Sequence, residues 1–328
     1  MQTLALGRSG PTVSRLGLGC MGMSDFYGPA DRRECIATIH AALDAGITLL
    51  DTGDFYGMGH NEMLVGEALA DKPREKVLLS VKFGALRTPG GAFAGIDGRP
   101  EAVRNFAAYS LKRLRTDYID IYRPARVDPK VPIEETVGAV ADLIRAGYVR
   151  HLGLSEAGSE TLRRAMSVQP VVDLQIEYSL VSRGIESGLL AAARELGIAV
   201  TAYGVLSRGL LTGTLPAALP GLRAHMPRFQ GENYRRNLRL VEALAAIARE
   251  RGVTPSQLAI AWVLSRGGDI VPLIGTTKRS RLAEAMAALS ITLTPAELSQ
   301  IERAVPADSV AGTRYAAEQM AHLDSERG

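Results

Sequence analysis

The sequence predicts an α/β fold, a single (β/α)8 TIM barrel, because short apolar runs alternate with amphipathic helical stretches eight times along the chain. Strict strand–helix alternation is typical of a parallel sheet joined by crossover helices, and eight units close a barrel. The chain has 328 residues, a length at which α/β barrels commonly form one domain. It contains no linker or low-complexity tract, so residues 1–328 are predicted to form a single domain.

The predicted strands are apolar runs that end in a polar residue, a glycine or a turn. They are Arg15–Gly19, Thr48–Asp51, Val77–Lys82, Ile119–Tyr122, His151–Leu154, Leu174–Glu177, Ala199–Tyr203 and Val271–Ile274. The helices between and after them repeat apolar residues three to four positions apart. They are Arg32–Ala45, Asn61–Leu69, Ala102–Leu114, Ile133–Ala146, Ser159–Ser167, Ser187–Leu196 and Arg279–Ala288.

Three segments lie outside this repeat. Thr3–Leu6 and Val13–Arg15 flank a turn rich in Gly and Pro, which predicts an N-terminal β-hairpin. Gly204–Arg235 is a long loop after the seventh strand, and long loops in compact domains are usually lids or binding loops. The extra helices expected after that loop are Asn237–Arg251, Pro255–Arg266 and, beyond the eighth unit, Pro295–Val305.

The composition excludes several classes of protein. Hydrophobic residues make up 46% and charged residues 22%, with a net charge of +3, and no basic stripe predicts a nucleic-acid partner. Two cysteines, Cys20 and Cys35, make neither a disulfide framework nor a metal-binding spacing. The start resembles no secretory signal, and no apolar run approaches about 18 residues. We therefore expect a cytoplasmic protein without a membrane partner or a metal.

A glycine motif follows the first strand, since Gly17, Gly19 and Gly22 match G-x-G-x-x-G. A dinucleotide-binding fingerprint needs a helix to open at the third glycine, because that helix N-terminus holds the pyrophosphate. Residues 23–29 form a loop pattern instead, and the next helix begins near Asp31. We interpret the motif as a loop at the top of the first barrel strand.

Polar residues at the carboxyl ends of barrel strands are the candidates for chemistry, since barrel sites lie at that end. Asp51 ends the second strand, Lys82 ends the third, and Tyr56 lies in the loop after Asp51. Neighbouring strands therefore place all three on one rim. They suit carbonyl reduction, in which the tyrosine donates a proton to the carbonyl oxygen. An adjacent ammonium is expected to lower the tyrosine pKa, and Asp51 to keep Lys82 charged. A purely structural ion pair remains the alternative.

A set of short motifs then occurs in one order along nearly the full length. They are Gly17-Leu18-Gly19, Asp51-Thr52-Gly53-Asp54-Phe55-Tyr56-Gly57, Asn61-Glu62, Ser80-Val81-Lys82, Asp117-Tyr118-Ile119-Asp120-Ile121-Tyr122, Gly153-Leu154-Ser155-Glu156, Gln175-Ile176-Glu177-Tyr178, Pro227-Arg228-Phe229 and Ile274-Gly275-Thr276-Thr277-Lys278. In this order they resemble the aldo-keto reductase family, within it the bacterial branch of pyridoxal-reductase-like enzymes.

The resemblance implies a reversible reduction of an aldehyde or ketone by NADPH, with Tyr56 as general acid. Ser155 and Gln175 would hold the nicotinamide carboxamide and Tyr203 would stack on its ring. Thr276, Lys278 and Arg281 open the last helix, where backbone N–H groups and cations suit the extra phosphate of NADPH; Arg279 adds charge. The implied cofactor residues are Ser155, Gln175, Tyr203, Gly204, Leu206, Ser207, Arg208, Gly275, Thr276, Thr277, Lys278, Arg281 and Glu284.

The chain departs from the family pattern at one catalytic position. The family has a histidine after the fourth strand, where this sequence has Ala125, followed by Arg126. Alanine donates no hydrogen bond, so the developing oxyanion loses a donor worth about 3 kcal/mol unless a water or Arg126 replaces it. Smaller departures are Gly204-Val205 for Ser-Pro and Ala285 for Asn.

Two alternatives of other classes stay open. Ala125 also fits an NADPH-binding sensor or regulatory subunit with weak turnover, and Lys82 could serve a Schiff-base lyase as its amine nucleophile. Under the leading hypothesis the partner is a small carbonyl or alcohol substrate, and the protein is a monomer or weak homo-oligomer.

Overall fold

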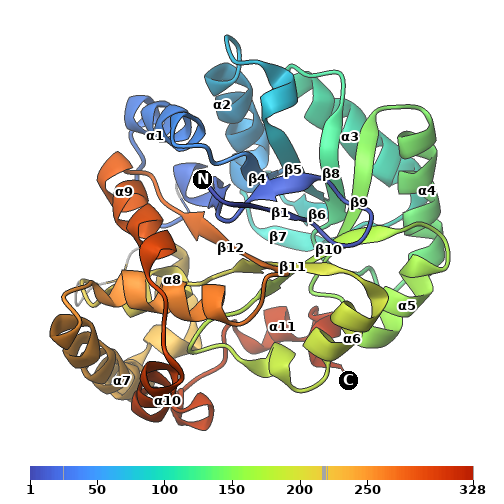
Figure 1. Ribbon diagram of the computed structural model, residues 1–328. Helices are drawn as coiled ribbons and strands as arrows, with labels where there is room; N and C mark the ends of the chain where they lie inside the picture. Colours follow the sequence, from blue (N-terminus) through green and yellow to red (C-terminus); the bar gives the residue numbers. More distant parts are fainter. Residues whose placement is uncertain (25, 216–218, 220, 328) are drawn as a thin grey trace.

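Eight parallel strands pair in one closed barrel in the order β3-β4-β5-β8-β9-β10-β11-β12 in this computed structural model (Figure 1). The strands are β3 Gly17–Gly19, β4 Leu49–Gly53, β5 Leu78–Phe83, β8 Ile119–Pro124, β9 Val149–Ser155, β10 Val171–Glu177, β11 Ala199–Tyr203 and β12 Ile270–Gly275. The structure describes residues 1–24, 26–215, 219 and 221–327. All eight predicted strands are confirmed, with differences of a few residues at their ends.

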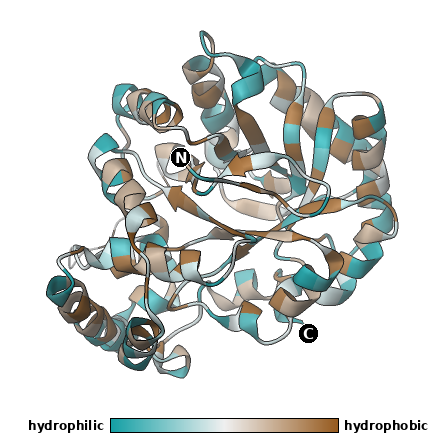
Figure 2. Ribbon diagram, in the orientation of Figure 1, coloured by the Kyte–Doolittle hydropathy of each residue, from teal (hydrophilic) through white to brown (hydrophobic). Residues whose placement is uncertain are grey.

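Helices surround the strands and cover the outer face of the barrel. They are α1 Arg32–Asp44, α2 His60–Ala68, α3 Pro100–Leu114, α4 Ile133–Arg145, α5 Ser159–Met166, α6 Leu189–Leu196, α7 Gly231–Glu250, α8 Pro255–Ser265, α9 Arg279–Ala287, α10 Pro295–Ala304 and α11 Ala317–Met320. The strands are mostly apolar, whereas the outer helices carry hydrophilic residues on part of their surface (Figure 2). Capping boxes start α8 at Thr254 and α10 at Thr294, which satisfies backbone donors there.

The predicted N-terminal hairpin is confirmed, with β1 Thr3–Ala5 paired to β2 Thr12–Ser14. Leu6, next to β1, and Val13 of β2 belong to one buried cluster with residues from the early parts of the barrel strands, among them Leu49 and Val172. The hairpin therefore packs across the amino-terminal end of the barrel (Figure 1), and the carboxyl ends of the strands remain for the site.

The loop after β11 is shorter than predicted, because α7 begins at Gly231 inside the segment Gly204–Arg235. The first turns of α7 are mostly polar, with Tyr234 as their one large apolar side chain, so no apolar periodicity marks the helix before Asn237. Three short 3-10 helices cover part of the rest of the loop, Ser207–Thr212, Gly221–His225 and Pro227–Phe229. Residues 216–218 and 220 of the predicted loop lie outside the described residues, as does Asp25 in the loop after Gly22.

Two further elements were not predicted. A second hairpin, β6 Ala85–Arg87 and β7 Phe93–Ile96, follows β5, and α11 lies in the C-terminal tail. Both stand at the carboxyl end of the barrel, where they line the main cavity. None of the helices in the described part of the chain is both long and apolar enough to cross a bilayer.

Candidate active site

Asp51 of β4 and Lys82 of β5 form a buried ion pair at the carboxyl rim of the barrel, exposed by only 2% and 4%. Two further groups donate to Asp51 Oδ2, Ser80 Oγ at 2.8 Å and Gln175 Nε2 at 2.7 Å. Burial lowers the pKa of Lys82, whereas the charge of Asp51 opposes that shift. The predicted neighbourhood of Asp51 and Lys82 is thus present in the structure.

Tyr56 lies beside this pair, since Lys82 Nζ is 5.2 Å from the centre of its ring. The ring packs edge-on against Phe55 at 4.7 Å and Phe26 at 5.5 Å. Burial, followed by the charge of Asp51, raises the pKa of Tyr56 well above its ordinary value. The expected lowering of this pKa is therefore wrong, because burial of the ring and the negative charge of Asp51 favour the protonated phenol.

Ala125 lies directly after β8, at the position where the family pattern has a histidine. It is buried, lines the cavity that Tyr56 lines, and its backbone N–H donates to the Phe83 carbonyl at 2.8 Å. Arg126 lines the same cavity, and its Nη1 donates to the Ala125 carbonyl at 2.6 Å. Arg126 therefore supplies a charged hydrogen-bond donor next to the position of the family's histidine.

One cavity of about 770 Å³ joins the Tyr56 end of the rim to the start of α9, which is a volume typical of ligand sites. Its lining includes Asp51, Tyr56 and Lys82 at one end and Lys278 and Arg281 at the other. The predicted cofactor residues that line it are Ser155, Gln175, Tyr203, Gly204, Leu206, Arg208, Gly275, Thr276, Thr277, Lys278, Arg281 and Glu284. Ser207, whose side chain is fully buried, is the one predicted cofactor residue that does not line it.

The groups expected to hold the nicotinamide already have protein partners. The Gln175 amide donates to Asp51, and Tyr203 Oη donates to Glu156 Oε1 at 2.7 Å and lies 3.0 Å from Tyr315 Oη. These bonds hold both side chains in place at the ends of β10 and β11. Ser155, at the end of β9, is buried beside Gln175 of β10 and lines the cavity.

The opposite end of the cavity carries positive charge from the start of α9. Lys278 has no carboxylate partner among the described residues, whereas Arg281 bonds Glu284 at 3.0 Å. Arg279 does not contribute as predicted, because it pairs with Glu34 at 2.9 Å and lies outside the cavity lining. Lys278 is thus the available cation, backed by the N-terminal backbone of α9.

Sequence patterns did not predict the cavity residues from the second hairpin, and they indicated the tail as part of the substrate pocket without its individual residues. These cavity residues are Ala85, Arg87, Phe93, Tyr315, Gln319 and His322. Phe93 and His322 meet with ring centres 5.4 Å apart, so the hairpin and the tail touch across the mouth. The one sequence feature that indicates this part of the cavity wall is the presence of basic and aromatic residues in the glycine-rich segment after β5.

A buried ion pair fixes the tail against the barrel. Arg314 donates to both oxygens of Glu156, at 2.7 and 2.6 Å, and Ser325 Oγ donates to the same carboxylate at 2.7 Å. Burial by itself would raise the pKa of Glu156, but Arg314 outweighs it and lowers the pKa to about 2. The carboxylate therefore stays charged and holds Tyr315 at the cavity.

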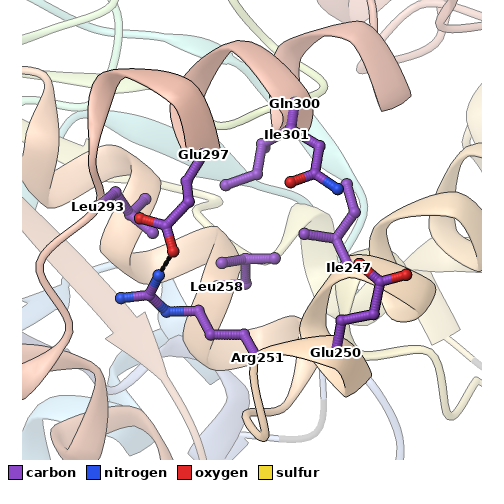
Figure 3. A pocket seen from close by; sticks show the side chains of 8 residues that line it. All are labelled: Ile247, Glu250, Arg251, Leu258, Leu293, Glu297, Gln300 and Ile301. Atoms are coloured by element: carbon purple, nitrogen blue, oxygen red, sulfur yellow. Dashed lines mark ion pairs between the residues drawn. The ribbon is translucent and has the colours of Figure 1, made fainter.

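A second cavity of about 190 Å³ lies between α7, α8 and α10 (Figure 3). The Arg251–Glu297 ion pair crosses its edge, and Leu258 and Ile301 contribute apolar surface. It shares no lining residue with the large cavity. The described residues contain no cluster of three or more His, Cys, Asp or Glu side chains that could hold a metal ion.

The carboxyl group of Asp54, in the loop between β4 and Tyr56, lies in surroundings that disfavour its charged form. Its Oδ2 accepts weakly from the Gly84 N–H at 3.3 Å, and its Oδ1 has no hydrogen-bond partner among the described residues. Burial, and next the nearby charge of Glu62, raise the pKa of Asp54 to about 7. This carboxyl group therefore costs stability whenever it is ionised.

The effect of Asp54 has a definite sign with pH. Between the unfolded pKa of about 3.9 and the folded pKa, the folded chain binds more protons, so stability falls as pH rises. We expect Asp54→Asn to raise Tm, by about 5 °C more at pH 8 than at pH 5. Thermal unfolding across this range measures it, with Asp71→Asn at an exposed carboxylate as the control. A pH-independent difference between Asp54→Asn and the parent contradicts the prediction.

Comparisons with known proteins agree with this architecture. Residues 15–306 match the model of the aldo/keto reductase family. The chain is 44% identical over 320 residues to a probable aldo-keto reductase 1 of Glycine max, covering 96% of this chain and 92% of that one.

Two solved structures share the fold over nearly the whole chain. A glycerol dehydrogenase from Gluconobacter oxydans superposes with a TM-score of 0.83 at 31% identity, covering 93% of this chain and 96% of that one. The holo form of an aldo-keto reductase from Bacillus halodurans gives 0.78 at 27%, covering 94% and 97%. This chain belongs to the aldo/keto reductase family of oxidoreductases.

Proposed function

We propose that the chain, as one domain of residues 1–328, reduces an aldehyde or ketone with NADPH and runs in reverse as an alcohol dehydrogenase. The observation that carries the proposal is that Tyr56, Lys82 and Asp51 line the same cavity as Lys278 and the start of α9. A proton donor thus shares one cavity with a cationic end suited to a phosphate group. We propose a small carbonyl or alcohol as its partner, a monomer or weak homo-oligomer as its state, and the cytoplasm as its location.

The cavity residues fit this cofactor. The volume of about 770 Å³ exceeds what a small carbonyl compound needs, and Lys278 offers a positive charge without a carboxylate partner in the described chain. In the proposal, Ser155, Gln175 and Tyr203 hold the nicotinamide end, Arg208 and the 204–208 loop cover the pyrophosphate, and Lys278 with Arg281 bind the adenosine phosphate. When bound, NADPH supplies the hydride that reduces the carbonyl carbon.

Tyr56 acts as general acid in this proposal. Its raised pKa keeps the phenol protonated through the neutral range, which is the state that a proton donor needs. The alkoxide that forms from the carbonyl is a far stronger base than a phenolate, so the proton moves from Tyr56 Oη to that oxygen. Lys82, within 5.2 Å of the ring, stabilises the phenolate left behind.

Asp51 serves this step through Lys82. Burial works against the charged amine of Lys82, and the carboxylate of Asp51 counters that effect at contact distance. Ser80 and Gln175 hold the second oxygen of Asp51, so the carboxylate is fixed on both sides. The ammonium is therefore kept charged and close to Tyr56.

The proposal is tested by following the absorbance of NADPH with a panel of aldehydes and ketones. We expect turnover of some members of the panel. The kcat/KM for NADPH should exceed that for NADH by at least about tenfold, because Lys278 can pair with the extra phosphate. Tight NADPH binding without turnover of any carbonyl contradicts the proposal and favours a cofactor-binding sensor. Equal use of NADH and NADPH contradicts the assigned role of Lys278.

A further inference from the structure

Several arginines line the large cavity, and they differ in what they bond. Arg208 bonds Glu177 at 2.9 Å and Arg281 bonds Glu284 at 3.0 Å. Arg87, Arg126 and Arg223 have no carboxylate partner among the described residues. Arg223, in the loop after β11, instead donates to the Arg208 carbonyl and lies over the ring of Tyr27. Arg87 and Arg126 stand at the Tyr56 end, where the substrate must bind.

Arg126 is placed beside the reacting position by Ala125. Its Nη1 bonds the Ala125 carbonyl, and its Cζ lies 5.7 Å from the ring of Tyr315, whose hydroxyl is 3.0 Å from that of Tyr203. A guanidinium has five N–H donors, and this one makes a single hydrogen bond to the described protein. The small side chain at position 125 leaves the space in front of it open to the cavity.

Arg87 approaches the same end from the β6–β7 hairpin. Its Cζ lies 5.5 Å from the Phe55 ring and 6.0 Å from the Phe26 ring. These two rings are the ones that pack edge-on against Tyr56. Arg87 and Arg126 therefore bring two positive charges, both half-buried, to the surroundings of one proton donor.

Two half-buried cations that make no direct ion pair with the described residues favour the binding of an anion. Two acidic groups act on them without a direct ion pair, Glu156 on Arg126 and Asp54 on Arg87. Glu156 is already paired with Arg314, and the pKa of Asp54 is raised to about 7, so each arginine keeps N–H donors for a further anion. Arginine binds carboxylate and phosphate oxygens through paired N–H donors. Resting on the proposed function, we infer that the substrate is a carbonyl compound that also carries a carboxylate or phosphate, which binds Arg126 with Arg87 as the second cation.

The inference is tested with three aldehydes of matched shape, 4-carboxybenzaldehyde, 4-formylphenyl phosphate and methyl 4-formylbenzoate. We expect kcat/KM for at least one anionic aldehyde to exceed that for the ester by about tenfold or more, and the better anion identifies the group. Arg126→Gln should bring the ratio close to one, and Arg126→Lys should restore part of it. Arg236→Gln, at an exposed arginine of α7, is the matched control.

A binding experiment separates this inference from the proposed function. Calorimetry with benzoate and with benzamide, on protein with and without NADP⁺, needs no turnover. We expect benzoate to bind more tightly than benzamide and to lose about tenfold in affinity in Arg126→Gln. If no aldehyde reacts but this pattern holds, the reductase proposal fails and the anion site stands. Benzoate that binds no better than benzamide overturns the anion site, whether or not the aldehydes react.

Discussion

Replacing Tyr56 with phenylalanine is expected to lower kcat for carbonyl reduction by about 10²- to 10⁴-fold, the usual contribution of a general acid. The change removes one hydroxyl and keeps the ring. The edge-on contacts with Phe26 and Phe55 are therefore retained. We expect the affinity for NADPH and the Tm to stay close to those of the parent, so the loss falls on the chemical step alone.

The measurement is single-turnover oxidation of bound NADPH by a saturating aldehyde, with Tm and NADPH affinity recorded on the same protein. Tyr148→Phe, which removes a hydroxyl from an exposed tyrosine, is the matched control. Because the pKa of Tyr56 is raised well above 10, we expect no loss of activity from its ionisation between about pH 6 and pH 9. A Tyr56→Phe protein with more than about a tenth of parental kcat contradicts the role of general acid.

Sequence patterns predicted the barrel and its rim because both follow from local rules. Apolar runs mark strands, and a polar residue that ends such a run, as Asp51 and Lys82 do, must lie at the open end of the barrel. The direction of the Tyr56 pKa was not predictable in this way. It depends on how deeply the ring is buried, beside Phe26 and Phe55, and on the nearby charge of Asp51, which are results of packing.

Long-range contacts account for most of what the sequence left out. Arg314 is 158 residues from Glu156, and no pattern in the tail indicates that it docks beside β9. Arg279 has the same charge as Lys278, yet only the fold shows that Arg279 pairs with Glu34 outside the cavity lining. The β6–β7 hairpin is short and rich in glycine, so it has no apolar alternation to mark it as a strand pair.

Removing Arg123 from the barrel interior is expected to cost about 3–5 kcal/mol of stability. Arg123 is fully buried, donates to Asp173 Oδ2 at 2.9 Å, and donates to Ser80 Oγ at 2.9 Å. Arg123→Met keeps much of the volume but leaves the Asp173 carboxylate buried without its counter-charge. We expect a fall in Tm of about 10 °C in thermal unfolding, and a fall of less than about 2 °C contradicts the prediction.

The double variant Arg123→Met/Asp173→Leu distinguishes two quantities. One is the stability lost when the Asp173 carboxylate is buried without a partner, and the other is the net contribution of the ion pair to stability. Arg123 Nε and Asp173 Oδ1 make no hydrogen bond among the described residues, so the pair is incompletely satisfied. A buried pair of that kind is often replaced by apolar residues without loss, and we expect the double variant to recover most of the lost Tm. The space is tight, since a Cβ at Gly153 would lie 2.6 Å from Asp173 Oδ1, and the added leucine must fit beside that glycine.

Recovery of stability need not bring recovery of activity, and the difference has a structural reason. Ser80 Oγ accepts from Arg123 and donates to Asp51, so one hydroxyl connects the interior pair to the carboxylate that holds Lys82. Without Arg123 that hydroxyl is free to turn, and Asp51 loses a fixed donor. We therefore expect the double variant to regain Tm while kcat stays below that of the parent. Parallel recovery of both quantities would show that Arg123 acts on the fold alone.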